Sequence, residues 1–302
     1  DPIDICYSDG VADDGSIDES MSVSAAKAYI EGLKKYVLKN PDAEYYTCGQ
    51  EDITSCCTCE RCSANFERFG YTSATVLRFY NAVAKEIQSW ADEQKELKGK
   101  QIKIVIFAYY FSAEAPVTKD ENGKYKPVDE SVVLADNVVV RFADITSNVF
   151  YSTVDDENST SVYNSEYFER WKPLLNNNCW YWTYTTNHTY FYAYTPTLQK
   201  LKKSLVAVKD AGCEYALLQP NSSDYHDWKA VMENYVCAKL LWNPYRDVNA
   251  LRNEFIDYYY GAAADDVRYV TFTLEEHISN LIQNVDKRFY VSPLDSIHLP
   301  AG

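Results

Sequence analysis

The stretch Tyr45-Tyr46-Thr47-Cys48-Gly49-Gln50-Glu51-Asp52 decides how the rest of the chain is interpreted. Its first residues are typical of a buried strand, and the strand ends in two adjacent carboxylates. In proteins that alternate strands and helices, the residues just past the C-terminal end of a strand line the substrate crevice. Gln50, Glu51 and Asp52 are therefore the first candidates for a functional site. Polar loop residues without a role would look the same in the sequence.

Apolar runs that recur along the chain indicate further strands, with helices between them. Predicted strands cover residues 3–7, 44–50, 102–109, 138–142, 179–184 and 214–219. Predicted helices cover residues 22–38, 73–97, 165–175 and 195–212, and the chain is expected to be helical from about residue 224. Asn122-Gly123 marks an expected hairpin tip after the third strand. Such an alternation predicts a parallel sheet with right-handed crossovers.

The fold class that this order favours is α/β, of the (β/α) TIM-barrel type. Eight strands close such a barrel and six are predicted, so the barrel would be incomplete. An open, doubly wound sheet is the alternative. No repeat, low-complexity segment or linker divides the 302 residues. We therefore predict a single domain over residues 1–302, with a helical C-terminal extension from about residue 224.

The composition excludes some classes of partner. The net charge is -15 and the pI is about 4.7, which argues against nucleic acid because a phosphate backbone needs a basic stripe. No run of apolar residues is long enough for a membrane span. The 27 tyrosines and 6 tryptophans are more than a core requires. Aromatic rings in a cleft suit sugars, although packing between helices and strands would also explain most of them.

The nine cysteines bear on the compartment. So many thiols are unusual in a reducing cytosol unless they bind metal, which favours export, and an odd number leaves at least one thiol unpaired within the chain. Residues 1–4 lack the basic and apolar regions of a signal peptide. We expect that any export signal has been removed or never existed.

Five cysteines lie in or beside the loop that follows the quoted stretch: Cys48, Cys56, Cys57, Cys59 and Cys62. The Cys-x-x-Cys spacing can place two sulfurs on one tetrahedral zinc ion, with Cys48 as a possible further ligand. Disulfides that shape the loop are the alternative. A catalytic metal is not expected, because no paired histidines accompany the thiols. We predict a structural clamp of one kind or the other.

Three motifs carry a resemblance to a known family. They are Gly49-Gln50-Glu51-Asp52, then Cys57-x-Cys59-x-x-Cys62, and Leu240-Leu241-Trp242-Asn243-Pro244 followed by Glu254-Phe255 and Tyr259-Tyr260-Gly261-Ala262-Ala263. Together they resemble a bacterial domain of initially unknown function in the glycoside-hydrolase TIM-barrel clan. Some members of this kind are endo-β-N-acetylglucosaminidases that act on complex N-glycans.

The resemblance implies a glycosidase-like barrel domain with a glycan substrate and no required cofactor. It also implies a secreted, cell-surface or periplasmic location, and earlier barrel strands supplied by an upstream segment of the parent protein. Residues 44–50 would then form the fourth barrel strand. The residue before Asp52 is often Asn in the family and is Glu51 here, so the family's role transfers more directly to Asp52.

The two neighbouring carboxylates favour one kind of glycoside hydrolysis. Retaining enzymes that use an enzyme nucleophile place two carboxyl groups about 5 Å apart across the sugar, which neighbours on one strand end do not easily achieve. Substrate-assisted cleavage fits better, because the acetamido oxygen of the sugar is then the nucleophile. In this interpretation one of Glu51 and Asp52 is the general acid, and the other orients the acetamide. N-acetylhexosamine-containing glycans are the expected substrates.

Other polar and aromatic residues near predicted strand ends complete the expected site. Those that could bind sugar, besides Gln50, are Tyr109, Trp180, Trp182, Tyr184 and Gln219. Glu114 and Asp144 are reserve carboxylates, although isolated loop acids are more often solvated. Two alternative functions remain open. The protein could be a non-catalytic glycan-binding module, or an exo-glycosidase that uses the reserve carboxylates.

Overall fold

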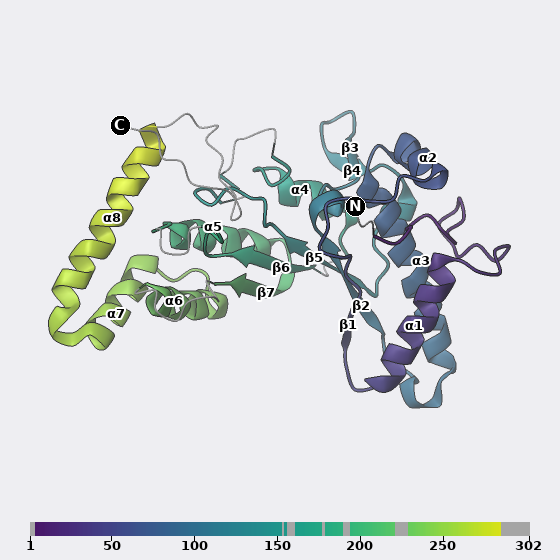
Figure 1. Ribbon diagram of the computed structural model, residues 1–302, viewed down its shortest axis with the longest axis horizontal. Helices are drawn as coiled ribbons and strands as arrows, with labels where there is room; N and C mark the ends of the chain where they lie inside the picture. Colours follow the sequence, from purple (N-terminus) through teal and green to yellow (C-terminus); the bar gives the residue numbers. More distant parts are fainter. Residues whose placement is uncertain are drawn as a thin grey trace. The chain divides into compact units, whose positions relative to one another are not determined.

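The computed structural model describes residues 4–152, 154–155, 161–176, 179–189, 194–220 and 229–284 (Figure 1). The chain forms two compact units. Unit 1 contains Asp1–Ala143 and Phe168–Trp180, and unit 2 contains Asp144–Tyr167 and Tyr181–Gly302.

Unit 1 is built on parallel strands. β1 (Tyr45–Thr47) pairs with β2 (Lys103–Ala108), and β2 pairs with β5 (Val138–Ala143). In this register Tyr45 lies opposite Lys103, and Ile104 lies opposite Val138. The order along the sheet follows the order along the chain, as it does in a (β/α) barrel.

Helices cover one face of these strands. They are α1 (Ala25–Lys39) and α3 (Thr72–Glu93), which Figure 1 shows on the same side of β1 and β2, while α2 (Glu60–Phe69) packs against α3. On β2, alternate residues Ile104, Ile106 and Ala108 are fully buried, and α3 contacts this strand. On the opposite face Val105 is buried too, whereas Lys103 and Phe107 on either side of it are only half-buried. The sheet of unit 1 therefore has a covered face and a more open one.

Short elements lie between the strands. The hairpin of β3 (Val117–Lys119) and β4 (Tyr125–Pro127) turns at Gly123, whose φ of 75° confirms the predicted tip. The predicted helix over residues 165–175 is shorter, since α4 (Tyr167–Trp171) gives way to a 3₁₀ turn that contains Pro173.

Unit 2 is mainly helical. It holds the last four residues of β6 (Cys179–Tyr184) and all of β7 (Cys213–Gln219). The helices that follow these strands are α5 (Thr197–Asp210), α6 (Ala230–Trp242), α7 (Val248–Tyr260) and α8 (Ala264–Asn284). Met232, Phe255 and Ile256 form part of a core cluster within this unit. The predicted helical C-terminal segment is confirmed from Ala230 to Asn284, whereas residues 221–228 and 285–302 lie outside the described part of the chain.

The predicted fold class is confirmed, with one strand fewer. Among the described residues the main sheet has five strands in the order β1-β2-β5-β6-β7, fewer than a closed barrel needs. The predicted strand over residues 3–7 is wrong for its described part. Asp4 accepts hydrogen bonds there from the Ile5 amide (2.8 Å) and the Tyr7 hydroxyl (2.9 Å), so a local turn replaces strand pairing. No described helix has both the length and the apolar character needed to cross a lipid bilayer.

Candidate functional site

The predicted carboxylates lie at the C-terminal end of β1, in unit 1. Tyr109 is the first residue after β2, and its hydroxyl donates a hydrogen bond to Asp52 Oδ1 at 2.8 Å. The side chains of Glu51 and Asp52 are both exposed. The parallel pairing of β1 and β2 explains the contact, because it brings the ends of both strands to one edge of the sheet. The structure thus joins two residues that the sequence places 57 positions apart.

The Gln50 side chain is hydrogen-bonded within the protein. Its Nε2 donates to the Tyr109 carbonyl at 2.9 Å, and its Oε1 accepts from the Ser112 hydroxyl at 2.5 Å. Both ends of the amide are therefore occupied within the protein. Gln50 holds the end of β1 against the end of β2 and is less suited to bind sugar than predicted.

A second anchor reaches the same loop from the N-terminal segment. The Glu51 backbone N–H donates to Asp4 Oδ2 at 3.1 Å, and the Tyr7 hydroxyl donates to the same oxygen at 2.9 Å. Asp4 itself is buried. The backbone at Glu51 is therefore fixed while its carboxylate faces solvent, which is the arrangement that an accessible acid requires.

The backbone next to Tyr109 is strained. Tyr110 is the one non-glycine residue with positive φ (45°) among the described residues. Its ring lies 4.0 Å from the ring of Tyr109, measured between centroids. Residues held in this region tend to occur at functional sites, where the surrounding structure enforces the conformation.

An aromatic group lies on the open face of the unit 1 strands. The Arg141 guanidinium, from β5, lies 5.1 Å from the Phe107 ring and 5.0 Å from the Trp180 ring. The Trp180 ring in turn lies 4.9 Å from that of Tyr45. Desolvation lowers the pKa of Arg141. Arg141 is absent from the predicted site, although a charge inside the apolar run Val138-Val139-Val140-Arg141-Phe142 is a recognisable signal.

The predicted sugar-binding residues of unit 2 divide into two groups. The Trp182 indole N–H donates to Gln219 Oε1 at 3.0 Å, and both side chains are half-buried. Tyr184 is buried, with its ring edge-on to the His188 imidazole at 5.6 Å. Burial also lowers the pKa of His188. Tyr184 is therefore a packing residue, whereas Trp182 retains an accessible surface.

The reserve carboxylates differ in their surroundings. Glu114 is exposed, as expected for a loop acid. Asp144 is 1% exposed, so the expectation that it is solvated is wrong. The Tyr181 hydroxyl donates to Asp144 Oδ2 at 2.7 Å. Desolvation raises the pKa of Asp144, although Lys200 and nearby hydroxyl groups oppose the shift. This carboxyl lies in a buried polar network, out of reach of a sugar.

The structure changes the membership of the cysteine cluster. The sulfurs of Cys6, Cys57, Cys59 and Cys62 all lie within 4.8 Å of one another. Cys56 and Cys48 are not in this group, so their predicted place in the clamp is wrong. Cys48 is buried on β1's C-terminal side, and burial raises its pKa to about 11. Cys6 could not be recognised as a member because about 50 residues separate it from the others.

The state of all nine cysteines is defined. Cys179 and Cys213 are disulfide-bonded. The free thiols are Cys6, Cys48, Cys56, Cys57, Cys59, Cys62 and Cys237. The predicted alternative of disulfides within the loop after β1 is therefore not what the structure contains.

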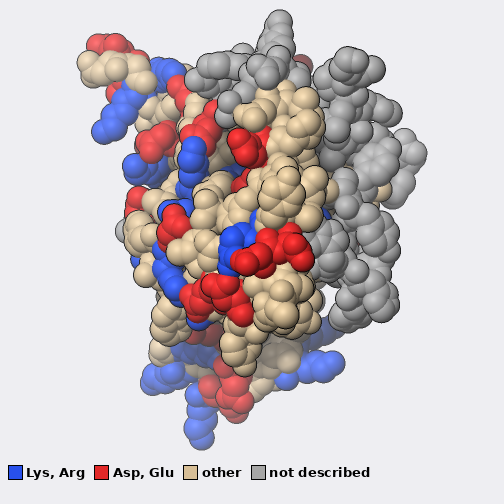
Figure 2. Space-filling view, turned by 90° about the vertical axis from the view of Figure 1, so that its left-hand side faces the viewer, with Lys and Arg blue, Asp and Glu red and all other residues tan. Residues whose placement is uncertain are grey.

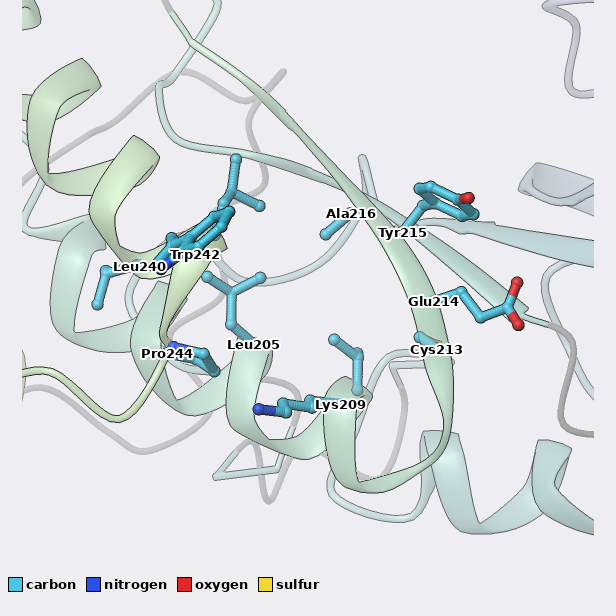
Figure 3. Close-up of a pocket in the computed structure, with 11 residues that line it drawn as sticks. Leu205, Lys209, Cys213, Glu214, Tyr215, Ala216, Leu240, Trp242 and Pro244 are labelled. Atoms are coloured by element: carbon cyan, nitrogen blue, oxygen red, sulfur yellow. The ribbon is translucent and has the colours of Figure 1, made fainter.

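Unit 2 has a pocket of about 390 Å³ that contains none of the predicted site residues, although Leu240, Leu241, Trp242 and Pro244 of the third family motif line it (Figure 3). It lies between α5, the start of β7 and the end of α6, and Leu205, Tyr215 and Trp242 are among its lining residues. Trp242 is 91% exposed. No described carboxylate except Glu214 lines this pocket, so it offers a mixed apolar and polar contact surface and not an acid pair.

Charged side chains of both signs alternate on the face shown in Figure 2. Unit 2 contains ion pairs such as Arg246 with Glu254 at 3.0 Å and Arg268 with Asp265 at 2.7 Å. Exposed pairs of this kind contribute little to stability. The uncharged areas between the charged side chains are therefore the more distinctive part of this face.

The comparisons with known proteins identify the family. No curated protein matches the chain. A solved structure, a "GH5-4 broad specificity endoglucanase from Ruminococcus flavefaciens", is similar with 12% sequence identity and a TM-score of 0.31, over 70% of this chain and 68% of that one. Residues 22–271 match the family described as "Domain of unknown function (DUF4838)". The chain belongs to this DUF4838 family.

Proposed function

We propose that the protein is a glycoside hydrolase that cleaves N-acetylhexosamine-containing glycans at Glu51 and Asp52. The observation that carries the proposal is the pair of exposed carboxylates at the end of β1, one of which accepts the Tyr109 hydroxyl at 2.8 Å. The strand ends of a parallel sheet are where ligands bind in α/β proteins. The anchors at Asp4 and Gln50 fix the backbone beneath both acids.

The contacts suggest a division of roles between the two acids. Asp52 is held on one oxygen by Tyr109, so its other oxygen is available to accept the N–H of a substrate acetamide. Glu51 has a fixed backbone and an exposed carboxyl group, as a general acid requires. Asp52 is accordingly the residue that orients the acetamide, and Glu51 is the acid.

The proposed reaction has two steps. The acetamide oxygen attacks the anomeric carbon as the glycosidic bond breaks, and the Glu51 proton passes to the leaving oxygen. Water then attacks the same carbon and opens the oxazoline ring, and its proton returns to Glu51. The anomeric configuration is retained over both steps.

Two further features support the proposal, one for the glycan substrate and one for the location of the protein. The open face of unit 1 presents the half-buried rings of Phe107 and Trp180 around Arg141, and aromatic faces stack on sugars. The disulfide-bonded Cys179 and Cys213 support export to the cell surface, periplasm or medium as part of the proposal, since disulfides persist in oxidising compartments.

The experiment measures turnover on 4-nitrophenyl and natural N-acetylhexosaminides by the purified protein and its Glu51→Gln and Asp52→Asn variants. Loss of a positioned acid should lower kcat/KM on natural linkages by about 10²–10⁴-fold. The loss in Glu51→Gln should be smaller with 4-nitrophenyl substrates, whose leaving group needs no proton. Asp52→Asn should remain impaired on both substrates and should bind an oxazoline-mimicking thiazoline inhibitor more weakly.

The matched control is Glu121→Gln, which alters another exposed carboxylate of unit 1. It should leave turnover unchanged. Unchanged turnover in both Glu51→Gln and Asp52→Asn would refute the proposal. Sugar binding by calorimetry without any turnover would instead identify a glycan-binding module.

A further inference from the structure

Four sulfur atoms converge in unit 1 from two distant parts of the sequence. Cys6 comes from the N-terminal segment, Cys57 and Cys59 come from the loop that leads into α2, and Cys62 lies in the first turn of α2. The Cys6 sulfur lies 3.6 Å from that of Cys59 and 3.6 Å from that of Cys62. All four sulfurs lie within 4.8 Å of one another.

These separations match a shared metal ion better than a disulfide. A disulfide brings two sulfurs to about 2.05 Å. Four thiolates around a zinc ion at about 2.3 Å stand about 3.8 Å apart when the geometry is tetrahedral. The two distances of 3.6 Å from the Cys6 sulfur are close to the second value, and four ligands are the number that a closed structural zinc site uses.

A hydroxyl group supports the sulfurs from outside. The Ser8 hydroxyl lies 3.1 Å from the Cys62 sulfur, and it accepts a hydrogen bond from the Asn65 amide at 2.9 Å. Such contacts orient metal-binding thiolates and stabilise their charge.

The nearest cation in the sequence does not supply a counter-charge. Arg61 lies between Cys59 and Cys62, but its guanidinium is directed to Asp18 (3.4 Å) and Asp9 (3.7 Å). Four converging thiolates would repel one another without a cation among them. A divalent ion at their centre removes this repulsion.

We propose that Cys6, Cys57, Cys59 and Cys62 bind a structural zinc ion. On binding, each thiol forms a bond to zinc and releases its proton to water, so the ion is held by four thiolates. The set is closed, with no position left for substrate or water, which gives the ion a structural role.

The proposed ion would join the N-terminal segment to the loop that bears the candidate acids. Cys6 lies between Asp4 and Tyr7 in the chain. Asp4 Oδ2 accepts hydrogen bonds from the Tyr7 hydroxyl and from the Glu51 backbone N–H. Zinc at Cys6 would therefore restrain Asp4, and Asp4 restrains Glu51. This link does not depend on what Glu51 does chemically.

The test begins with the metal content of the reduced, desalted protein, measured by inductively coupled plasma mass spectrometry. We expect one zinc ion per chain, lost in Cys6→Ser and in Cys59→Ser. Cobalt substituted for zinc should show the visible bands and thiolate charge-transfer absorption of a tetrahedral sulfur site. Hydrogen exchange of residues 49–62 should accelerate when zinc is removed by a chelator.

The matched control is Cys56→Ser, because Cys56 neighbours Cys57 but lies outside the cluster. It should keep the full zinc content. Absence of zinc and of cobalt binding in the wild-type protein would overturn the proposal, as would bound iron or disulfides among the four cysteines. Equal metal loss in Cys56→Ser and Cys6→Ser would overturn the assigned ligand set. None of these readouts requires glycosidase activity, so the two proposals fail independently.

Discussion

Asp52 in unit 1 and Asp144 in unit 2 form the same contact in opposite environments. Each follows a strand of the sheet, and each accepts a tyrosine hydroxyl, at 2.8 Å from Tyr109 and at 2.7 Å from Tyr181. Asp52 is exposed, whereas Asp144 is 1% exposed. Tyr109 therefore orients a carboxylate that solvent can reach, whereas Tyr181 provides a hydrogen bond to a carboxyl group that is buried.

The difference shows that position after a strand does not by itself make a catalytic candidate. The Tyr109 side chain is carried past the end of β2, so Asp52 meets it at the open edge of the sheet. Tyr181 lies within β6 on the buried face, with Cys179 and Thr183, so it meets Asp144 in the interior. The face from which the partner comes decides whether a ligand can reach the acid.

The largest expected effect is on stability, when each acid is replaced by alanine. Asp144→Ala leaves the buried Tyr181 hydroxyl and Lys200 ammonium without their acidic partner, and should lower the free energy of unfolding by about 3 kcal/mol. Asp52→Ala should change it by less than about 0.5 kcal/mol. Urea denaturation monitored by circular dichroism measures both. Equal effects would remove the distinction between the two sites.

A somewhat smaller effect is expected at Gly49, which precedes the candidate acids. A Cβ at this position would lie 2.5 Å from Cδ2 of Phe107, so Gly49→Ala should lower the free energy of unfolding by about 2 kcal/mol. The control is Gly32→Ala in α1, where a Cβ meets nothing within 4 Å. It should stabilise the protein by about 0.5–1 kcal/mol. A neutral Gly49→Ala would show that the Phe107 ring moves aside easily.

The two tyrosines offer a third test. Tyr181→Phe removes a hydrogen bond from a buried carboxyl and should destabilise the fold by about 1–2 kcal/mol. Tyr109→Phe should leave stability nearly unchanged but should lower kcat on N-acetylhexosaminides several-fold, because Asp52 loses its orientation. Thermal unfolding and initial rates separate the two outcomes. A stability loss in Tyr109→Phe with normal turnover would assign Tyr109 to packing alone.

The smallest expected effect is a pH dependence at Asp144. Burial raises its pKa, so the native state keeps this proton at pH values where the unfolded chain has released it. Its contribution to stability is therefore complete below the unfolded pKa of about 3.9, and is lost as the pH rises through the raised native pKa. The stability of wild type relative to Asp144→Asn should thus fall as the pH rises from about 4 through the raised native pKa of Asp144. A relative stability that rises over this range would contradict the assignment.

Much of the fold could be predicted because apolar periodicity is a local signal. The strands near residues 103–108 and 138–143, the hairpin tip and the C-terminal helices followed from it. The prediction of a strand at residues 3–7 was wrong because a short apolar run does not indicate that the Asp4 side chain closes a turn.

The candidate site was less predictable, since its contacts join residues far apart in the chain. The meeting of Asp52 with Tyr109 follows from strand order, which the sequence indicates. The burial of Asp144 and the membership of Cys6 in the sulfur cluster depend on how loops pack, which no local pattern encodes.

Two tryptophans give each unit its own optical reporter. Trp171 of unit 1 is 1% exposed and donates its indole N–H to the Ala113 carbonyl at 3.1 Å, whereas Trp242 of unit 2 is 91% exposed. Acrylamide should therefore quench the red-shifted emission of Trp242 and leave the blue-shifted emission of Trp171 nearly intact. Difference spectra against Trp242→Phe and Trp171→Phe would then follow the unfolding of each unit separately, and show whether the two melt in one step or in two.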